Sequence, residues 1–309
     1  MRESRIQKRK KWKKILLSGL IVFFALLAAG LGYAYNLYSQ VNKAATKMHE
    51  KIDWVGSGNQ KEKIEQKKPL NILLMGVDER TGDKGRSDSL ILMQLNAEND
   101  SMTMLSIPRD TRVEIAGRGK MDKINHSYAF GGTKMTVETV ENFLDIKLDY
   151  YIKVNMEALS EIVDALGGIT VNNTLTWSDE GYYKKGYVYK KGEINLDGPK
   201  TLGYVRMRHL DNNGDFGRQA RQRQVINAIV DKGANISSIN KVDNVLDVLG
   251  DRVKTNMTFA EMKDIQKGYI GTRKNKKTLE LKGSGSKING VYYWVPNQGS
   301  VEQVKNEIK

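Results

Sequence analysis

Short apolar runs alternate with segments of helical periodicity from about residue 70 onward. The runs with the length and flanking turn residues of buried strands are NILLMGV (71–77), SLILMQL (89–95), MTMLSI (102–107), YYIKV (150–154) and ITV (169–171). Apolar residues recur at helical spacing in 133–144 and 156–168, and 216–249 also has a helical pattern. Strands that alternate with helices predict a layered α/β/α domain with a central mixed sheet, spanning 70–309.

One segment near the start differs from these because it has no polar face. Residues 15–35 read ILLSGLIVFFALLAAGLGYAY and carry no charge, which matches the roughly 20 residues that a helix needs to cross a bilayer. A cleaved signal peptide is the alternative, but this run exceeds the roughly 7–15 apolar residues of a signal core. The pattern therefore predicts one N-terminal transmembrane helix, followed by a membrane-proximal helix and linker over 36–69.

Basic residues before that helix predict its orientation. Eight Lys and Arg stand among residues 1–14, against the single acid Glu3. By the positive-inside rule this tail stays in the cytoplasm, which places 70–309 outside the cell membrane as an extracytoplasmic domain. The tail's +7 is half of the formal net charge of +14, so the body is only mildly basic.

Composition removes several classes of site. The chain has no Cys, which excludes disulfides, thiolate zinc sites and cysteine nucleophiles. Its three His (His49, His126 and His209) are far apart in sequence, which disfavours a His-rich metal site. Neither a nucleotide-binding P-loop nor a G-x-S-x-G elbow occurs, so the chemistry must come from other residues.

Arginine is rare in this chain but clustered. There are 35 Lys and 15 Arg, and ten of the arginines lie in two groups, five in 80–118 and five in 206–223. The planar guanidinium with its several donors suits phosphate, whereas Lys suffices for solubility. Solvated surface charge is the alternative for any single Arg, but it does not account for the clustering. Arg218, Arg221 and Gln222 share one helical face near a predicted helix start, where an anion bound by these arginines would offset the unfavourable placement of cations.

Two carboxylates stand at the ends of adjacent predicted strands. Asp78 follows NILLMGV and Asp88 precedes SLILMQL, so both can reach one hard cation. Mg²⁺ (or Mn²⁺) accepts one or two carboxylates and completes its shell with water and phosphate oxygens. The alternative is structural, with Asp78 in a turn and Asp88 paired with Arg86. The nearby arginines favour the metal, because cations and a divalent ion together stabilise a transferring phosphoryl group.

Several motifs occur in order between about residues 70 and 235. They are GVDER (76–80), RSDSLIL (86–92), SIPRDT (106–111), KINHSYAFGG (123–132), VDALGGI (163–169) and RMRHLDNNGDFGRQARQRQ (206–224). Together with the basic tail and the single apolar span, they resemble the LytR-CpsA-Psr family of wall-polymer ligases. No motif beyond residue 235 supports an expectation.

The resemblance implies a set of site residues. Magnesium would bind Asp78 and Asp88, and these two would form the catalytic group with Arg109. The pyrophosphate of a polyprenyl carrier would be held by the arginines Arg109, Arg206, Arg208 and Arg218. Further polar motif positions with phosphate-binding roles are Arg86, Lys123, Asp215 and Gln222. The lipid would lie in an apolar tunnel formed by the faces of 133–144, 156–166 and 225–230.

The resemblance also implies a reaction and its partners. An anionic glycopolymer of the wall teichoic acid type would move from polyprenyl pyrophosphate to the 6-hydroxyl of a peptidoglycan muramic acid, releasing polyprenyl phosphate. The acceptor of the hydroxyl proton is left open between Asp78 and Asp88. The expected partners are therefore the lipid-linked polymer, peptidoglycan and the membrane, with no nucleic acid.

Other functions are compatible with parts of this pattern. A DNA-binding regulator would need a cytoplasmic basic fold, which the predicted anchor contradicts. A non-catalytic wall-polymer binding protein would use the same Arg and Asp residues to bind pyrophosphate. A hydrolase would cut the same pyrophosphate with water, and only its products would distinguish it from a ligase.

Overall fold

The computed structural model describes residues 30–50, 52, 59–79, 85–233 and 242–308, which fall in two compact units, Met1–Lys43 and Ala44–Lys309. In the described part of the chain, no helix has the length and hydropathy of a membrane span. The basic tail 1–14 and most of the predicted span 15–35 lie outside the described residues. Residues 30–48 are helical, and α2 (Gln60–Glu65) follows.

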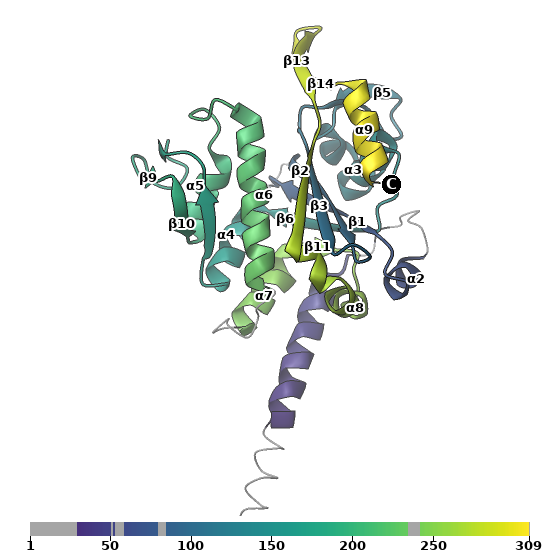
Figure 1. Ribbon diagram of the computed structural model, residues 1–309, viewed down its shortest axis with the longest axis vertical. Coiled ribbons are helices and arrows are strands. Elements are labelled where there is room, and N and C mark those ends of the chain that lie inside the picture. The colour runs from purple at the N-terminus through teal and green to yellow at the C-terminus, as the bar shows by residue number, and fades with distance from the viewer. Residues whose placement is uncertain (1–29, 51, 53–58, 80–84, 234–241, 309) are drawn as a thin grey trace, which may run out of the picture. The chain divides into compact units, whose positions relative to one another are not determined.

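A mixed six-stranded sheet forms the centre of the second unit (Figure 1). Its strands, in the order β11-β6-β1-β2-β3-β12, are β11 (Val253–Thr255), β6 (Tyr150–Asn155), β1 (Leu70–Val77), β2 (Ser87–Asn96), β3 (Ser101–Ile107) and β12 (Asn275–Glu280). Strand β2 is antiparallel to both of its neighbours, whereas β1 is parallel to β6 and β3 is parallel to β12. This confirms the predicted α/β domain with a central mixed sheet.

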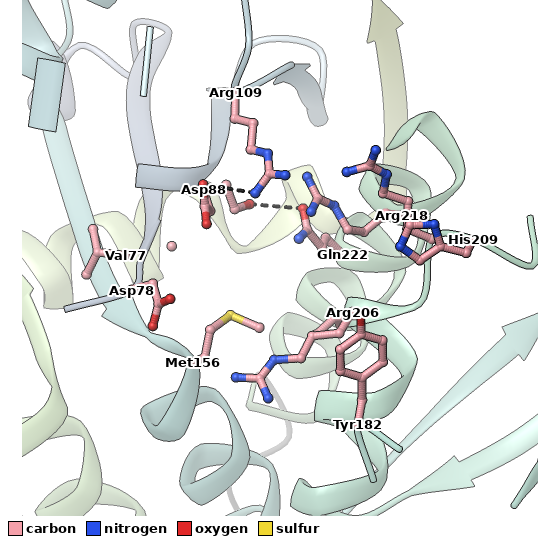
Figure 2. Close-up of a pocket in the computed structure, with 14 residues that line it drawn as sticks. Val77, Asp78, Asp88, Arg109, Met156, Tyr182, Arg206, His209, Arg218 and Gln222 are labelled. Atoms are coloured by element: carbon pink, nitrogen blue, oxygen red, sulfur yellow. Dashed lines mark hydrogen bonds and ion pairs between the residues drawn. The ribbon is translucent and has the colours of Figure 1, made fainter. Parts of the chain in front are cut away.

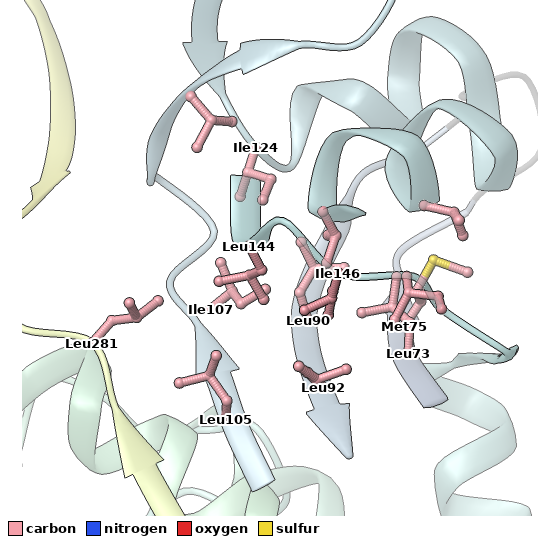
Figure 3. Close-up of a cluster of buried hydrophobic side chains, with 14 of the residues drawn as sticks. Leu73, Met75, Leu90, Leu92, Leu105, Ile107, Ile124, Leu144, Ile146 and Leu281 are labelled. Carbon is pink, nitrogen blue, oxygen red and sulfur yellow. The ribbon is translucent and has the colours of Figure 1, made fainter. Parts of the chain in front are cut away.

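Both faces of the sheet are covered at its centre, so the strands β1, β2 and β3 are mostly apolar, whereas the edge strand β12 is polar and largely exposed. Leu73 and Met75 point to one face and pack against α3 (His126–Leu144) and α9 (Gln298–Ile308). Figure 3 shows part of this cluster, with the side chain of Leu144 among those of the strands. Alternate residues such as Ile72 point to the other face, beside α8 (Phe259–Tyr269) and α6 (Gly214–Gly233). The two-residue period of a strand thus divides one apolar run between two cores.

Several predicted elements differ from the structure in extent or partner. Of the predicted helix 216–249, the described parts are α6 and α7 (Val242–Arg252), and 234–241 lie outside the described residues. The ITV run is β7 (Ile169–Asn173), but it pairs with β10 (Gly192–Leu196) in a separate two-stranded sheet. Before it, α4 (Met156–Ala165) follows β6 and ends ahead of two glycines with positive φ, Gly167 and Gly168.

The remaining elements are short. They are β4 (Arg112–Ile115), β5 (Lys120–Lys123), β8 (Trp177–Ser178), β9 (Val188–Tyr189), α5 (Gly198–Arg206), η2 (Ile270–Lys274), β13 (Gly283–Ile288) and β14 (Val291–Pro296). Helix α5 begins at Asp197, whose side chain accepts a hydrogen bond from the backbone N–H of Lys200. It ends at Arg206, so the fold places that arginine at a helix terminus.

Candidate functional site

The end of β1 and the start of β2 lie side by side and carry the two predicted carboxylates. Val77 pairs with Ser87 across the antiparallel ladder, so Asp78 comes directly after β1 and Asp88 is the second residue of β2. The backbone N–H of Asp78 donates to the carbonyl of Arg86 at 3.1 Å. Gly85 has a φ of +70°, and a Cβ there would come within 2.3 Å of the Asp78 carbonyl oxygen. Only glycine allows the chain to approach Asp78 this closely.

A cavity of about 390 Å³ opens at these strand ends. The predicted site residues that line it are Asp78, Asp88, Arg109, Arg206, Arg208, Arg218 and Gln222. They come from the ends of β1, β2 and β3, the last residue of α5, the loop after it and the first turns of α6. Figure 2 shows Asp78 and Asp88 on one side of the open space and Arg206 and Arg218 on the other. Residues more than 100 positions apart thus meet in one cavity.

The carboxylate of Asp88 has well-defined partners. Arg109 Nη1 lies 3.2 Å from Asp88 Oδ1, and Asn125 Nδ2 donates to the same oxygen at 3.3 Å. Ser89, the next residue, also lines the cavity, and its Oγ donates to Gln222 Oε1 at 3.1 Å, which joins β2 to α6. These contacts hold Arg109 and Gln222 in fixed orientations toward the open space.

The electrostatics of the cavity favour an anion. Four arginines line it against two carboxylates. Burial lowers the pKa of the Arg218 guanidinium; the carboxylate of Asp215, 2.5 Å away, opposes the shift, and the charges of Arg109 and Arg208 add to it. Repulsion between cations in a partly desolvated site is unfavourable until an anion neutralises it. Phosphate oxygens, which accept the parallel N–H bonds of a guanidinium, are suited to that role.

A buried arginine supports the loop that carries Arg208. Arg221 is 4% exposed; its Nη1 donates to Asp211 Oδ2 and its Nη2 to the carbonyl of Met207, each at 2.6 Å. Its guanidinium also lies 5.3 Å from the ring of Trp177. The prediction that Arg221 binds an anion together with Arg218 is therefore wrong, because its guanidinium is buried against Asp211 and Met207 and connects α6 to residues 207–211.

Three predicted site residues do not line the cavity. Arg86 is exposed next to Gly85. Lys123 forms an ion pair with Asp110 at 2.7 Å, next to Arg109 in sequence. Asp215 lies behind Arg218, to which it is paired, and accepts a hydrogen bond from Gln219. Their contacts place Lys123 and Asp215 around the binding arginines rather than in contact with the open space.

Several residues that line the cavity were not predicted. They are Tyr182, His209 and Ser89, whereas Met156, which also lines it, belongs to the predicted lipid-binding segment 156–166. His209 could have been found from its position directly after Arg208 in the RMRHLD motif. Tyr182 lies between β8 and β9, a segment with no motif and no periodicity, so no signal in the sequence indicated it.

The sheet separates one of the predicted lipid-binding segments from the cavity. Residues 133–144 pack on the face of the sheet that carries Leu73 and Met75. The cavity lies on the opposite face, because Ser89, which lines it, shares its side of β2 with Ile91, whereas Leu90 and Leu92 of β2 belong to the same cluster as Leu73 and Met75. That face carries Ile226 of α6 and Ile152 of β6, both partly buried. The apolar surface next to the cavity therefore comes from 156–166 and 225–230 without 133–144.

The cavity offers a limited set of metal ligands. Asp78 and Asp88 are the carboxylates that line it, and the described residues contain no group of three or more His, Asp or Glu placed to hold an ion. An oxygen donor set of this size fits Mg²⁺ bound jointly by one or two carboxylates and substrate phosphates. It does not fit a metal held by protein ligands alone.

Comparison with known proteins gives consistent matches over nearly the whole chain. The LytR_cpsA_psr family model matches residues 35–309. The polyisoprenyl-teichoic acid–peptidoglycan teichoic acid transferase TagU of Bacillus subtilis (strain 168) is 50% identical over 305 residues, which cover 99% of this chain and 98% of that protein. The crystal structure of B. subtilis TagU aligns with a TM-score of 0.63 and 50% identity, covering 78% of this chain and 95% of that one. A structure of TagT bound to LIIa-WTA aligns with a TM-score of 0.65 and 34% identity, covering 78% and 89%.

Proposed function

The chain belongs to the LytR-CpsA-Psr family, and on that basis we propose that it is a teichoic acid transferase. It moves teichoic acid from a polyisoprenyl carrier to peptidoglycan, the activity that names its relative TagU. The observation that carries this proposal is the convergence of four arginines and two carboxylates in one cavity. A site with that charge and those donors suits a pyrophosphate ester.

The arginines bind the pyrophosphate and stabilise its charge during transfer. Arg206 and Arg208 flank Met207, whose carbonyl is held by Arg221, so the loop presents them on a supported backbone. Arg218 and Arg109 approach from α6 and from the end of β3. As the bridging oxygen leaves, negative charge grows on the departing phosphate, and these fixed cations offset it without rearrangement.

The transfer is a displacement at phosphorus. The acceptor hydroxyl oxygen of a peptidoglycan muramic acid forms a bond to the phosphorus that carries the sugar. The bond from that phosphorus to the bridging oxygen breaks, and this oxygen leaves with the electron pair as part of polyprenyl phosphate. The hydroxyl proton passes to Asp78 or Asp88, the carboxylates that line the cavity. The product is a phosphodiester between polymer and wall.

Magnesium (or manganese) is the cofactor we propose, with Asp78 and Asp88 as the residues that would hold it. A divalent ion at this position would neutralise phosphate oxygens as charge develops on them. The acid pair and the arginines supply complementary parts of one phosphoryl-transfer site.

We also propose that the chain is a single-pass membrane protein. The support is the uncharged run 15–35 directly after the basic tail 1–14. The tail would lie in the cytoplasm and residues 70–309 outside, where the polymer and the wall meet. A transferase that acts on a lipid-linked polymer and on the wall requires this placement.

Reconstituted transfer tests the function and the metal together. We expect the purified chain, given a polyprenyl-pyrophosphate glycopolymer and peptidoglycan oligomers with magnesium, to form a phosphodiester-linked adduct detectable by mass. Asp78→Ala and Asp88→Ala should abolish the metal-dependent transfer while leaving the thermal unfolding transition in place.

The products separate the alternatives. Free phospho-polymer with polyprenyl phosphate would identify a hydrolase, and tight precursor binding without any product would identify a carrier. Full activity of either aspartate variant, or undiminished activity in a chelator, would refute the shared-metal assignment.

A further inference from the structure

A second cavity, of about 540 Å³, lies on the other side of α6. It is bounded by the N-terminal half of that helix, by the loop before it and by the adjacent strands β3 and β12. In Figure 1, α6 runs beside the long C-terminal strand that leads up to the hairpin β13–β14. We refer to this second cavity as the α6–β12 cavity. Its size is within the roughly 300–1,000 Å³ of small-ligand sites.

The α6–β12 cavity differs in charge from the first cavity. We call that first one the arginine cavity, because Arg109, Arg206, Arg208 and Arg218 line it. The ionisable lining residues of the α6–β12 cavity are Arg223 and Glu280, one of each sign. Arg223 Nη1 also donates to Ser106 Oγ at 2.6 Å, which fixes its guanidinium against β3. One positive and one negative side chain give no net attraction for a phosphate. Four arginines with two aspartates carry a net positive charge and therefore attract one. The ligand that matches the α6–β12 cavity is therefore polar and uncharged at the point of contact.

The other lining residues have the character of a sugar-binding surface. Asn212 and Asn213 are exposed at its rim, and their amide groups can both donate and accept hydrogen bonds, as sugar hydroxyls and acetamido groups do. Phe216 is 45% exposed, and its ring packs edge-on against Trp294 at a centroid distance of 6.2 Å. Trp294 is 5% exposed and holds the aromatic ring in place while leaving its other side open.

The two cavities are adjacent around the start of α6. Arg218 and Gln222 line one, and Phe216, Ala220 and Arg223 line the other. The loop before the helix is divided in the same way, with His209 on one side and Asn212 on the other. A helix with its side chains is roughly 10–12 Å across, so a glycan of a few sugars can lie in the α6–β12 cavity and still reach the arginines.

We propose that the α6–β12 cavity binds the glycan of the acceptor, the N-acetylated sugar chain of peptidoglycan. This inference rests on the proposed transferase function. The donor sugar is bonded to the phosphate in the arginine cavity, so the arginine cavity itself must accommodate it. The acceptor has no charge at its backbone sugars and must approach from a separate direction. The α6–β12 cavity gives it polar contacts, an aromatic surface and a path to the phosphorus.

The test combines direct binding with transfer kinetics, using the full chain in detergent. The binding probe is a peptidoglycan tetrasaccharide without donor, titrated by calorimetry or saturation-transfer NMR. Loss of one aromatic contact should weaken binding roughly three- to tenfold in Phe216→Ala. Asn212→Ala, at an exposed position that cannot threaten the fold, should weaken it about two- to tenfold.

A matched control is available on the far face of the sheet. Phe130 is 40% exposed and has the same edge-on ring contact, to His126 at 6.0 Å, but it lines neither cavity. Phe130→Ala should bind the tetrasaccharide like the wild type. In transfer assays, Phe216→Ala and Asn212→Ala should raise KM for the acceptor, with KM for the donor and kcat at saturating acceptor unchanged.

The binding and transfer results together distinguish the acceptor site from its alternatives. If Phe216→Ala and Asn212→Ala bind the tetrasaccharide as tightly as Phe130→Ala, the acceptor site is elsewhere. If KM for the donor rises instead, the α6–β12 cavity holds the sugars of the donor polymer, and the acceptor assignment is wrong. If the wild type binds the tetrasaccharide, the variants bind it more weakly and no transfer occurs, the glycan site stands and the transferase assignment fails.

Discussion

Arginine has two different tasks in and around the arginine cavity. Arg206 and Arg208 line it, whereas Arg221 lies behind them and donates to the carbonyl of the residue between them. Because the guanidinium is planar with several fixed donors, one buried Arg221 can contact a side chain, a carbonyl and an aromatic ring at once. The binding arginines depend on this contact for the position of their backbone.

Replacing Arg206 with lysine keeps the positive charge but removes the planar guanidinium and its parallel N–H donors. We expect Arg206→Lys to lower kcat/KM for the donor roughly 10- to 100-fold, since a charge-assisted hydrogen bond contributes about 1.5–3 kcal/mol. Steady-state transfer rates at varied donor concentration give kcat/KM for both proteins. Arg252→Lys, in an exposed ion pair with Glu161 at 2.9 Å, is the control and should behave as wild type. Wild-type kinetics for Arg206→Lys would count against bidentate phosphate binding.

The buried pair of Arg221 and Asp211 should appear in the pH dependence of stability. Burial raises the pKa of Asp211, but hydrogen bonds from Arg221 and from the Asn213 backbone outweigh it, so the pKa lies below its usual value. A depressed folded-state pKa stabilises the fold above the unfolded value of about 3.9 and loses that effect as pH falls through the folded value. We expect Asp211→Asn to lower the free energy of unfolding by about 3 kcal/mol at pH 7.

That difference should narrow as pH falls below about 3.9, where the Asp211 carboxylate of the unfolded chain takes up a proton, and should disappear once pH falls through the lower pKa of the folded state. Urea unfolding between about pH 3 and pH 7 measures this difference for both proteins. Asp251→Asn removes an exposed ion pair with Lys47 and should have little effect at any pH. A pH-independent difference for Asp211→Asn would show that packing, and not the charge, stabilises this loop.

At the scale of elements, helix α3 is two helical segments joined at a bend. Gly131 and Gly132 have non-helical backbone angles inside it, and Gly132 adopts φ +62° and ψ −151°. This region is open to glycine and strained for other residues. The bend places the first segment, with Asn125 at its start, beside Asp88, while the second packs on the sheet. The glycine pair thus connects a site contact to the core.

Substituting the glycine at the bend should destabilise the domain. We expect Gly132→Ala to lower the free energy of unfolding by about 1–3 kcal/mol, because alanine must adopt a strained backbone there. Gly268, in α8 and with open space around it, is the matched control. Gly268→Ala should raise stability by about 0.5–1 kcal/mol through lower entropy of the unfolded chain. Equal effects of both changes in chemical denaturation would contradict the strain at residue 132.

At the scale of the whole molecule, charge is distributed in three ways. The tail 1–14 carries +7 of the net +14, the arginine cavity concentrates four arginines, and the α6–β12 cavity is balanced. The basic tail suits the proposed contact with a cytoplasmic membrane surface, and the arginine cavity suits a pyrophosphate. The balanced α6–β12 cavity suits an uncharged glycan. The proposed topology therefore has a separate charge environment for each partner.

Protease accessibility tests that topology. In intact cells stripped of their wall, added protease should remove residues 70–309 and spare a tag placed before residue 1, because only the domain faces outward. Detergent-lysed cells serve as the control, in which both parts are degraded. Protection of the domain in intact cells would reverse the proposed orientation.

Local sequence patterns were enough to predict the strands β1, β2, β3 and β6 and the α/β class, and residue chemistry was enough to propose a phosphate ligand. Strand and helix periods are local properties, and a guanidinium or a carboxylate has the same chemistry wherever it lies. The neighbouring positions of Asp78 and Asp88 also followed from sequence, because they stand at the facing ends of two successive strands that pair with each other.

The tertiary structure alone decided which charged residues share a cavity. Arg221 and Arg218 are three positions apart on α6, yet one is buried against Asp211 and the other faces the site. The α6–β12 cavity joins Ser106, Arg223 and Glu280, which no spacing rule connects. Such groupings depend on how a helix is rotated and packed on the sheet. This orientation is set by long-range packing of apolar side chains, which local sequence patterns do not specify.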